Sequence, residues 1–332
     1  MKKLIYLIIS IFLLLGCSKP SQAVNEFKQD QVKQKEPKQE EKFFSPYTGE
    51  EIDKNTYSKI PFMAIIENSK LSRPHSGLIH ADIVYETMAE GGISRFIALY
   101  HKNDSSKIGP IRSARPYFLD ISIENNLPFA HCGYSEEAKQ RIQKENLPSL
   151  NEFTYEKYYW RDNSRQYEHS LYTSSNLREL IKDKNLVSSP RSSLKFDKLF
   201  WENNGNNATE VSLKINTYYT TSYVFENNAY TKYMDGEKCI DNEENLPVEI
   251  DNIIIQLTDI SLQNDGIHID VNLIGEGDCY IISNGKYVKG KWVKKSLTSP
   301  TVFLDSNNVE IPMNPGNTWW NIFDHRITIR FE

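Results

Sequence analysis

The apolar pattern in the first half of the chain changes repeatedly between that of strands and that of helices. Residues 61–68 (PFMAIIEN) are a continuous apolar run with polar flanks, which predicts a buried strand, and residues 128–133 predict a shorter one. Helical signals include Pro116 in a first turn and Ser135 as an N-cap. The three predicted helices are 114–126, 135–146 and 174–185.

A Gly-Gly pair separates two strand-like runs in this half. Residues 83–90 and 93–102 flank the pair, which is typical of a two-residue hairpin turn. That register places Arg95 on the same face of the hairpin as Glu86 and Glu90, diagonally between them. The hairpin therefore predicts an ion-pair cluster.

After about residue 195 the pattern consists of short apolar runs broken by turn residues. Asn-Asn, Asn-Gly and Asn-Asp-Gly sequences separate the runs, and they favour tight hairpin turns. We predict an α+β fold, with a mixed α/β N-terminal domain at 43–190, a linker region at 191–210 and a smaller, mostly antiparallel β domain at 211–332.

The first residues carry a secretion signal. Two lysines precede an apolar run from Leu4 to Leu15, which is shorter than the roughly 20 residues of a membrane-spanning helix. The sequence LLGC that ends at Cys17 resembles the lipobox of bacterial lipoproteins. This resemblance implies a signal peptide at 1–16 and a diacylglyceryl group on the Cys17 thiol. We therefore expect a lipid anchor in the cell membrane, with the protein on the extracytoplasmic side.

Residues 17–42 follow as a polar segment of Lys, Gln and Glu with almost nothing to bury. Such a composition predicts a disordered tether behind the lipidated cysteine. A tether of this kind would hold the folded part away from the bilayer.

Composition and charge narrow the classes of function. The chain has 332 residues and a formal net charge of −5, so it lacks the basic footprint of a nucleic-acid-binding protein. Phosphate-loop and dinucleotide motifs are absent, and no cofactor is predicted. Three cysteines follow Cys17, and this odd number argues against a disulfide framework, although a Cys239–Cys279 bridge remains open.

The segment IGPIRSARPYF (108–118) places Arg112 and Arg115 at the entrance of a predicted helix. A helix N-terminus carries partial positive charge, so two guanidinium groups there predict a nearby anion. That anion is either a protein carboxylate or a bound ligand, and both interpretations stay open. The candidate internal charge partners are Asp82, Glu86 and Glu90. The other side chains predicted to line the site are Arg73, Arg95, Arg161, Arg165 and His169.

Catalytic and metal-binding alternatives are weaker. His75, His80 and Asp82, or His131 with Cys132, lack a metal-ligand spacing, so no metal site is predicted. Cys132 beside His131 would point to the opposite face of a strand, and Ser113 has no nucleophile signature. Glu86 and Glu90 could form an acid/base pair, but Arg95 between them would keep both carboxylates ionised.

Two aromatic runs are candidates for ligand contact. Residues 155–160 (YEKYYW) and 317–320 (NTWW) could grip a sugar or a peptide, although such groups more often belong to a core or a sheet surface.

Several long motifs carry a family resemblance. The segments from RPHSG to FIALY, then IGPIRSARPYF, HCGY and YWRDNSRQYEHSLY, and in the second half YTKYMDG, GEGDCYIISNGKYVKG and NPGNTWW, resemble the YerB-like family of bacterial lipoproteins. The resemblance implies a lipid anchor, an N-terminal domain of unknown function and a distinct smaller C-terminal domain. It supplies no reaction and no ligand. This chain has Glu168-His169-Ser170 where the family tends toward Pro-His-Asn, and the added carboxylate would weaken an anion site there.

The sequence thus predicts a membrane-anchored extracytoplasmic lipoprotein of unknown biochemical activity. The predicted arginine-lined cleft would bind an anionic cell-wall ligand or an envelope protein. The alternative is a cell-wall-acting hydrolase, and the sequence leaves open whether the protein is an enzyme.

Overall fold

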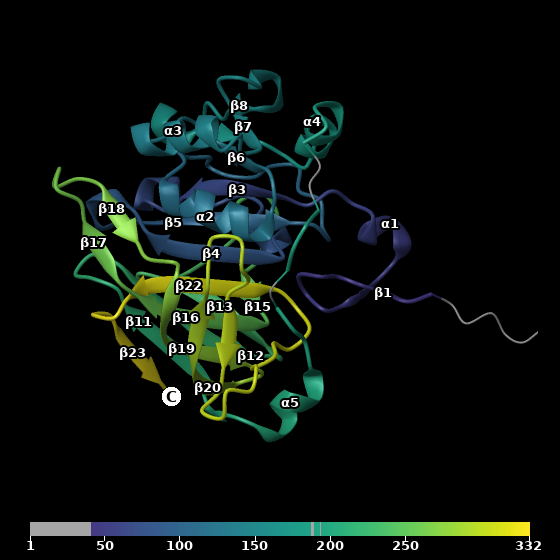
Figure 1. Cartoon of the computed structure of the whole chain (residues 1–332), viewed down its shortest axis with the longest axis vertical. Coiled ribbons are helices and arrows are strands. Elements are labelled where there is room, and N and C mark those ends of the chain that lie inside the picture. The colour runs from purple at the N-terminus through teal and green to yellow at the C-terminus, as the bar shows by residue number, and fades with distance from the viewer. Residues whose placement is uncertain (1–40, 187–188, 193) are drawn as a thin grey trace, which may run out of the picture. The chain divides into compact units, whose positions relative to one another are not determined.

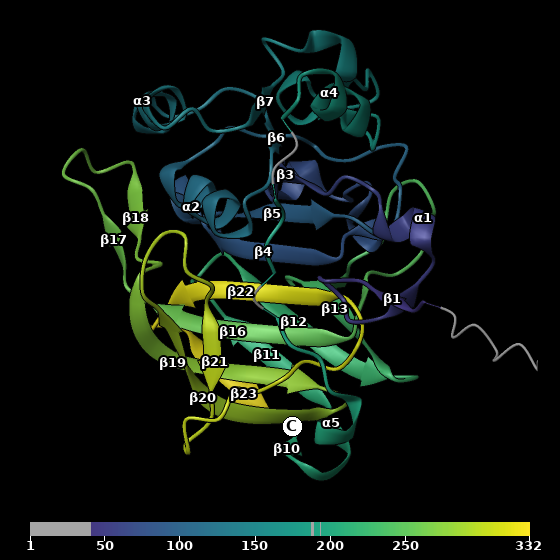
Figure 2. The ribbon, with the colours of Figure 1, turned by 45° about the vertical axis from the view of Figure 1, so that its right-hand side comes forward.

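One of the last strands of the chain lies beside one of the first, so that both halves of the chain contribute to a single sheet. The computed structural model describes residues 41–186, 189–192 and 194–332. Strand β22 (Thr318–Asp324) pairs in parallel with β4 (Ile83–Met88) on one side and with β16 (Asn252–Thr258) on the other (Figure 1 and Figure 2).

In the described residues this sheet has 11 strands. Beyond β4 it continues through strands of the first half, and beyond β16 through strands of the second half. On the β4 side these are β5 (Ser94–Tyr100), β3 (Phe62–Glu67), β6 (Phe129–His131) and β7 (Ser149–Asn151). On the β16 side they are β19 (Gly275–Ser283), β20 (Lys286–Lys294), β10 (Asn206–Asn207) and, also paired with β20, β21 (Val302–Leu304).

A second, six-stranded sheet covers part of one face of the first. Alternate residues of β22 show the two environments: Trp319 and Phe323 face a core shared with the second sheet, whereas Trp320 and Ile322 face a separate core on the other side. The strands of the second sheet are β11 (Glu210–Lys214), β12 (Thr220–Glu226), β13 (Ala229–Met234), β14 (Glu237–Lys238), β15 (Glu249–Ile250) and β23 (Thr328–Phe331).

The helices and the short strand pairs lie around these two sheets (Figure 1). The residues of α2 pack into the core that contains Trp320, and those of α4 pack into the core that contains Trp319. The α-helices are α1 (Lys54–Tyr57), α2 (Pro116–Asn125), α3 (Glu136–Lys144), α4 (Leu177–Asp183) and α5 (Lys198–Asn203). The short pairs are β1 (Phe43–Phe44) with β2 (Glu51–Ile52), β8 (Trp160–Arg161) with β9 (Leu171–Tyr172), and β17 (Ile260–Leu262) with β18 (Ile269–Val271).

The predicted α+β fold class is confirmed: helices and strands mix in the first half, and mostly antiparallel strands form the second. Local signals explain several elements. Pro116 opens α2, and Ser135 caps α3 by accepting a hydrogen bond from the backbone N–H of Ala138. Asn284 and Gly285, both at positive φ, form the turn between β19 and β20.

The predicted register of the β4–β5 hairpin is wrong by one residue. Ala89 N donates to Ile93 O across a three-residue turn, and Arg95 lies opposite Thr87 instead of Met88. Because side chains alternate along a strand, this shift moves Arg95 to the face opposite Glu86. The expected cluster of Arg95 with Glu86 therefore does not form.

Part of the sequence-based prediction lies outside the described residues. The predicted signal peptide at 1–16, the lipidated Cys17 and nearly all of the tether belong to that part. Within the described ranges, each helix is too short or too polar to cross a lipid bilayer.

Candidate functional site

Arg112 of the segment IGPIRSARPYF is bound by a carboxylate that the sequence did not indicate. Its backbone N–H donates to Ile65 O of β3, which brings the side chain to the end of that strand. There Nε of Arg112 lies 3.0 Å from Oε2 of Glu67, and Nη2 lies 3.2 Å from Oε1. The side chain of Glu67 is 8% exposed, whereas that of Arg112 is 30% exposed.

Glu67 also binds His169, which was predicted to be a ligand residue. Nδ1 of His169 lies 2.8 Å from Oε2 of Glu67, and the Ser69 hydroxyl donates to Oε1 at 2.7 Å. Both carboxylate oxygens of Glu67 are therefore engaged by the protein. Glu67 is the last residue of a buried apolar strand. A lone acid at that position was the sequence signal that could have predicted a carboxylate partner for Arg112.

Arg115 and Arg95 share one carboxylate, that of Glu90. Nε of Arg115 hydrogen-bonds to Glu90 Oε1, and Nη2 of Arg95 lies 3.7 Å from Oε2. Burial alone would raise the pKa of Glu90, but the hydrogen bond and charge of Arg115, together with the charge of Arg95, hold it below its usual value. Arg95 also donates to Ser113 O at 3.0 Å. Two cations therefore face a single acid.

The other two predicted charge partners lie elsewhere, which corrects the expected cluster. Asp82 accepts hydrogen bonds from the backbone N–H groups of His101 and Lys102, at 2.6 and 3.0 Å. Glu86 points into the core between the two sheets, where its Oε2 lies 3.2 Å from Nζ of Lys232. The observed hairpin register explains the separation of Glu86 from Arg95.

The remaining arginines differ in their partners. Arg73 binds Asp235, with Nη1 2.8 Å from Oδ2. Arg165 donates to the backbone oxygens of Ser72 and Pro74, at 2.9 and 2.6 Å. It thereby holds the loop that contains Arg73. Arg165 thus supports the backbone near the site, and no carboxylate of the described residues forms an ion pair with it.

Arg161 contacts an aromatic ring instead of an acid. Its guanidinium lies over the ring of Tyr167, 3.9 Å from the ring centroid, and Nη1 donates to Tyr167 O at 2.8 Å. Among the described residues, no carboxylate forms an ion pair with it. Tyr167 is 68% exposed, so a flat ring with a cation stacked on it faces solvent.

The contacts join these side chains into one surface, which we call the arginine face: Arg112, Cys132, Phe153, Arg161 and Tyr167. The backbone N–H of Cys132 donates to Arg112 O, and the charges of Arg161 and Arg112 both act on the Cys132 thiol. Phe153, 72% exposed, lies beside Gly133, whose added Cβ would be 3.6 Å from its ring and from Oγ of Ser113. Two acids lie close to this face. The carboxylate of Glu152 accepts a hydrogen bond from the Cys132 thiol, and the exposed Glu168 follows Tyr167 in the sequence.

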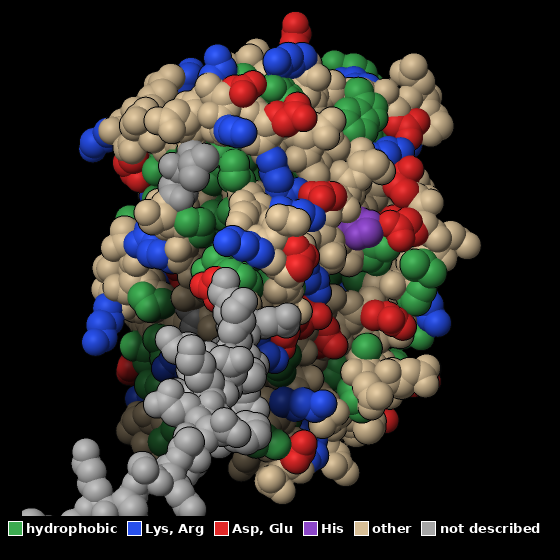
Figure 3. Space-filling model, turned by 90° about the vertical axis from the view of Figure 1, so that its right-hand side faces the viewer, with side chains coloured by type: hydrophobic (Ala, Val, Ile, Leu, Met, Phe, Trp, Pro, Cys, Tyr) green, Lys and Arg blue, Asp and Glu red, His purple; other side chains and the backbone are tan. Residues whose placement is uncertain are grey.

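The surface of the protein carries no single-sign field on the face that Figure 3 shows, since acidic and basic side chains are scattered over it. Recognition of a charged ligand on this face would therefore depend on local contacts and not on a long-range field.

The geometry does not favour the catalytic alternatives. Burial, reinforced by the charge of Glu152, raises the pKa of the Cys132 thiol to about 11, so the nucleophilic thiolate is scarce at neutral pH. Burial lowers the pKa of His131 to about 4, and both of its ring nitrogens are engaged, by Gly133 O and by the Ser149 hydroxyl. Glu86 and Glu90 bind different partners and do not form an acid/base pair.

The histidine and cysteine side chains of the described residues form neither a metal site nor a disulfide. Within the described ranges, no group of three or more His, Cys, Asp or Glu side chains is arranged to hold a metal ion. Cys132, Cys239 and Cys279 are free thiols, so Cys239 and Cys279 do not form the bridge that the sequence left open.

Comparisons with known proteins agree with the resemblance noted in the sequence. Residues 47–187 match the family model described as "Protein of unknown function (DUF3048) N-terminal domain", and residues 209–320 match the corresponding C-terminal domain. "Putative lipoprotein YerB" of Bacillus subtilis is 27% identical over 303 residues, which cover 88% of this chain and 89% of that protein.

A solved structure matches as well. The crystal structure of YerB protein from Bacillus subtilis aligns with a TM-score of 0.77 and 26% identity, over 87% of this chain and 99% of that chain. The part of this chain from Lys42 to Glu332 forms one compact unit.

Proposed function

Because the chain belongs to the DUF3048 family, whose matched relative is named as a lipoprotein, we propose that it is a lipid-anchored protein of the cell envelope that binds an anionic envelope ligand. Its anchor would be the diacylglyceryl group on Cys17, and the folded part would face the extracytoplasmic side. The binding surface would be the arginine face, and its ligand would be an anionic wall polymer.

The observation that carries this proposal is the guanidinium of Arg161, which is stacked on the exposed ring of Tyr167 and forms no ion pair with a carboxylate of the described residues. Arg95, Arg112 and Arg115 lie near it around Ser113 and Cys132, and Glu67 and Glu90 supply the two carboxylates that these three contact. With Glu152 and the exposed Glu168 counted, four carboxylates stand near the four arginines. Arg161 is therefore the cation that favours an anion from outside the protein.

The exposed aromatic rings indicate the chemistry of the rest of the ligand. Phe153 and Tyr167 are 72% and 68% exposed, and both rings belong to the same face as Arg161. Such rings stack against the apolar faces of sugars or bases, and guanidinium groups bind carboxylates and phosphates. We therefore expect sugar rings that carry carboxylates, or polyol chains that carry phosphates, to bind this surface better than a neutral peptide does.

The proposal can be tested by co-sedimentation of residues 42–332 with purified Bacillus cell walls. We expect saturable binding that weakens with salt, because the contact is partly electrostatic. Arg161→Ala, Phe153→Ala and Tyr167→Ala should each reduce the affinity by about fivefold or more, in line with the loss of one exposed cation–π or stacking contact.

Two matched variants serve as controls. Arg326→Ala removes an arginine whose side chain is 80% exposed, and Tyr218→Ala removes a tyrosine that is 79% exposed; both lie outside the arginine face. Walls stripped of phosphate polymers distinguish phosphate from wall carboxylates as the bound anion. Equal binding by the face variants and the controls would overturn the proposal. The proposal would also be overturned if the protein bound neither the intact nor the stripped walls.

A further inference from the structure

A cavity of about 550 Å³ shares no lining residue with the arginine face. One wall is the loop that contains Lys70, Arg73 and His75, from the first half of the chain. The other wall, from the second half, is the turn between β13 and β14 with Asp235, together with Lys238 of β14. The cavity volume falls within the range of ordinary small-molecule sites.

The floor of this cavity is apolar and rigid. Leu78, Met234, Val248 and Trp319 line it, and each of them is at most 4% exposed. The indole N–H of Trp319 donates to Glu86 Oε2 at 2.8 Å, and Nζ of Lys232 lies 4.1 Å from the centroid of its ring. These contacts fix the ring from below, so that a preformed apolar surface is available to a ligand.

The rim of the cavity is charged and open to solvent. The Lys70 side chain is 74% exposed, and Nζ lies 3.9 Å from Asp235 Oδ2, to which Arg73 also donates. Lys238 and Glu237 are exposed on the facing strand β14. Three cations thus stand against two carboxylates, and Asp235 is already shared by two of the cations.

His75 adds a hydrogen-bond acceptor at the wall. Its Nε2 lies 2.7 Å from Glu67 O, and because a carbonyl only accepts, Nε2 carries the proton. Burial lowers the pKa of His75 to about 3, so the ring stays neutral and Nδ1 is left as an acceptor. Within the described residues, the hydrogen bond of the ring is the one that Nε2 makes.

We infer that this cavity binds a small organic anion, whose hydrophobic body lies on the floor at Trp319 and whose carboxylate, phosphate or sulfonate lies at the rim near Lys70, Arg73 and Lys238. The apolar floor supplies most of the affinity through burial of the hydrophobic body. The three cations of the rim favour a ligand with a negative charge. The lining of this site includes none of the five residues of the arginine face.

Anilinonaphthalene sulfonate (ANS) has this combination of aromatic body and anionic group, and its fluorescence rises in apolar sites. We expect residues 42–332 to bind one ANS molecule saturably. Lys70→Ala/Lys238→Ala should weaken binding by about fivefold, because two exposed cations are removed from the rim. Glu237→Lys should tighten binding by about twofold, because it replaces a rim acid with a cation.

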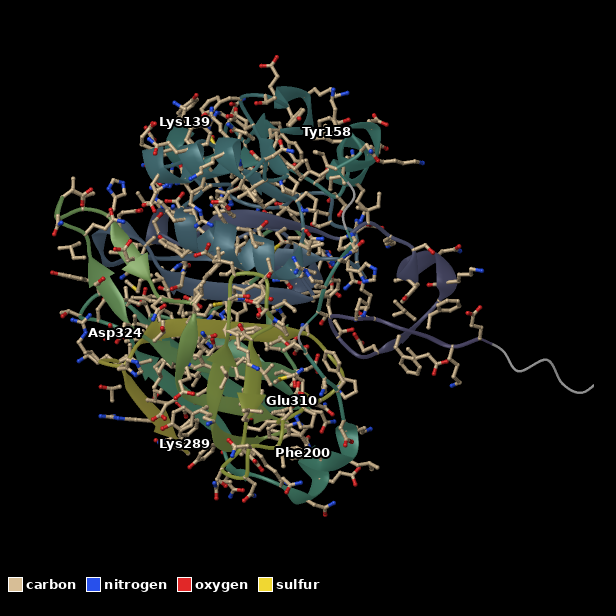
Figure 4. The ribbon with its side chains drawn as sticks, viewed as in Figure 1. Lys139, Tyr158, Phe200, Lys289, Glu310 and Asp324 are labelled. Carbon is tan, nitrogen blue, oxygen red and sulfur yellow. The ribbon has the colours of Figure 1, made fainter. Side chains whose placement is uncertain are left out.

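Two controls make the assignment specific. Lys289→Ala removes an exposed lysine on β20, labelled in Figure 4, that does not line the cavity, and it should leave ANS binding unchanged. Phenylnaphthylamine, which has similar rings and no sulfonate, should bind at least about fivefold more weakly than ANS. Thermal unfolding of each variant confirms that the fold is intact.

Three results would overturn the inference: equal affinity of the double variant and the unmodified protein, equal affinity for phenylnaphthylamine and ANS, or an equal loss in Lys289→Ala. Cell-wall binding is measured separately with the arginine-face variants. Failure of one site is therefore distinguishable from failure of the other.

Discussion

Nζ of Lys232 lies 3.2 Å from Oε2 of Glu86, and both side chains are completely buried between the two sheets. Lys232 belongs to β13 in the second half of the chain, and Glu86 belongs to β4 in the first half. Lys232 also donates to the hydroxyl oxygens of Thr221 and Tyr223, at 2.7 and 3.0 Å. Burial alone would lower the pKa of Lys232, but Glu86 and Tyr223 hold it above its usual value. The pair therefore fixes how the two sheets meet.

Breaking this pair should be more costly than removing it. Glu86→Gln leaves a buried ammonium without its counter-charge, and we expect a loss of about 3–5 kcal/mol in the free energy of unfolding. Lys232→Met should cost a similar amount, because it leaves Glu86 buried and unpaired. The double variant should be more stable than the sum of the two single losses predicts, by more than about 1 kcal/mol. Denaturant unfolding measures all three, and strict additivity would contradict the coupling.

The buried Asp82 should make stability depend on pH. Burial raises its pKa from 3.8 to about 6, despite the backbone hydrogen bonds from His101 and Lys102 that oppose the change. The folded protein thus binds the Asp82 proton more tightly than the unfolded chain. The stabilisation is complete below the unfolded pKa and is lost as the pH rises through about 6.

Asp82→Asn isolates this effect from that of other titrating groups, because asparagine does not titrate. Its amide oxygen can still accept hydrogen bonds from both backbone N–H groups. Lowering the pH from about 7 to about 5 should stabilise the original protein relative to this variant by about 1 kcal/mol. The measurement is denaturant unfolding at the two pH values. A difference in stability that does not change with pH would show that Asp82 titrates as it does in water.

Much of the fold was predictable because the signals are local. Pro116 and Ser135 mark the starts of α2 and α3, and Asn-Gly marks the β19–β20 turn, since these residue types satisfy specific backbone requirements. The parallel pairing of β22 with β4 was not predictable in this way. More than 200 residues separate the strands, and no local pattern states which edges of two sheets join.

The candidate site was predictable only in part, for a related reason. The sequence indicated that Arg112 and Arg115 need an anion, and Glu67 and Glu90 supply it. Glu67 was missed because two of its partners, Arg112 and His169, lie 45 and 102 residues away in the sequence. Arg95 was assigned to the wrong face because a turn of two residues and one of three differ by one position in register.

Arg165 should act mainly through the loop that it holds. Its side chain donates to Ser72 O and Pro74 O, and Ser72 is completely buried. We expect Arg165→Ala to lower the free energy of unfolding by about 1–3 kcal/mol, because the carbonyl group of the buried Ser72 loses a charged donor. Arg161→Ala, whose contacts lie within its own loop, should cost less than about 0.5 kcal/mol. Denaturant unfolding compares the two, and equal losses would contradict a loop-holding role for Arg165.

Glu90 occupies the position that an outside anion would otherwise take between Arg95 and Arg115. Glu90→Gln keeps the shape of the side chain but leaves two largely buried guanidinium groups facing each other without a carboxylate. We expect this variant to be less stable by about 1–3 kcal/mol and to regain part of that loss in millimolar sulfate or phosphate, which binds the vacated position. Chloride at matched ionic strength is the control, because screening alone would act equally through either salt. The gain from sulfate over chloride should be larger in Glu90→Gln than in the unmodified protein, since only the variant has the vacated position. If the two proteins gain equally from sulfate over chloride, the two arginines do not form an anion site.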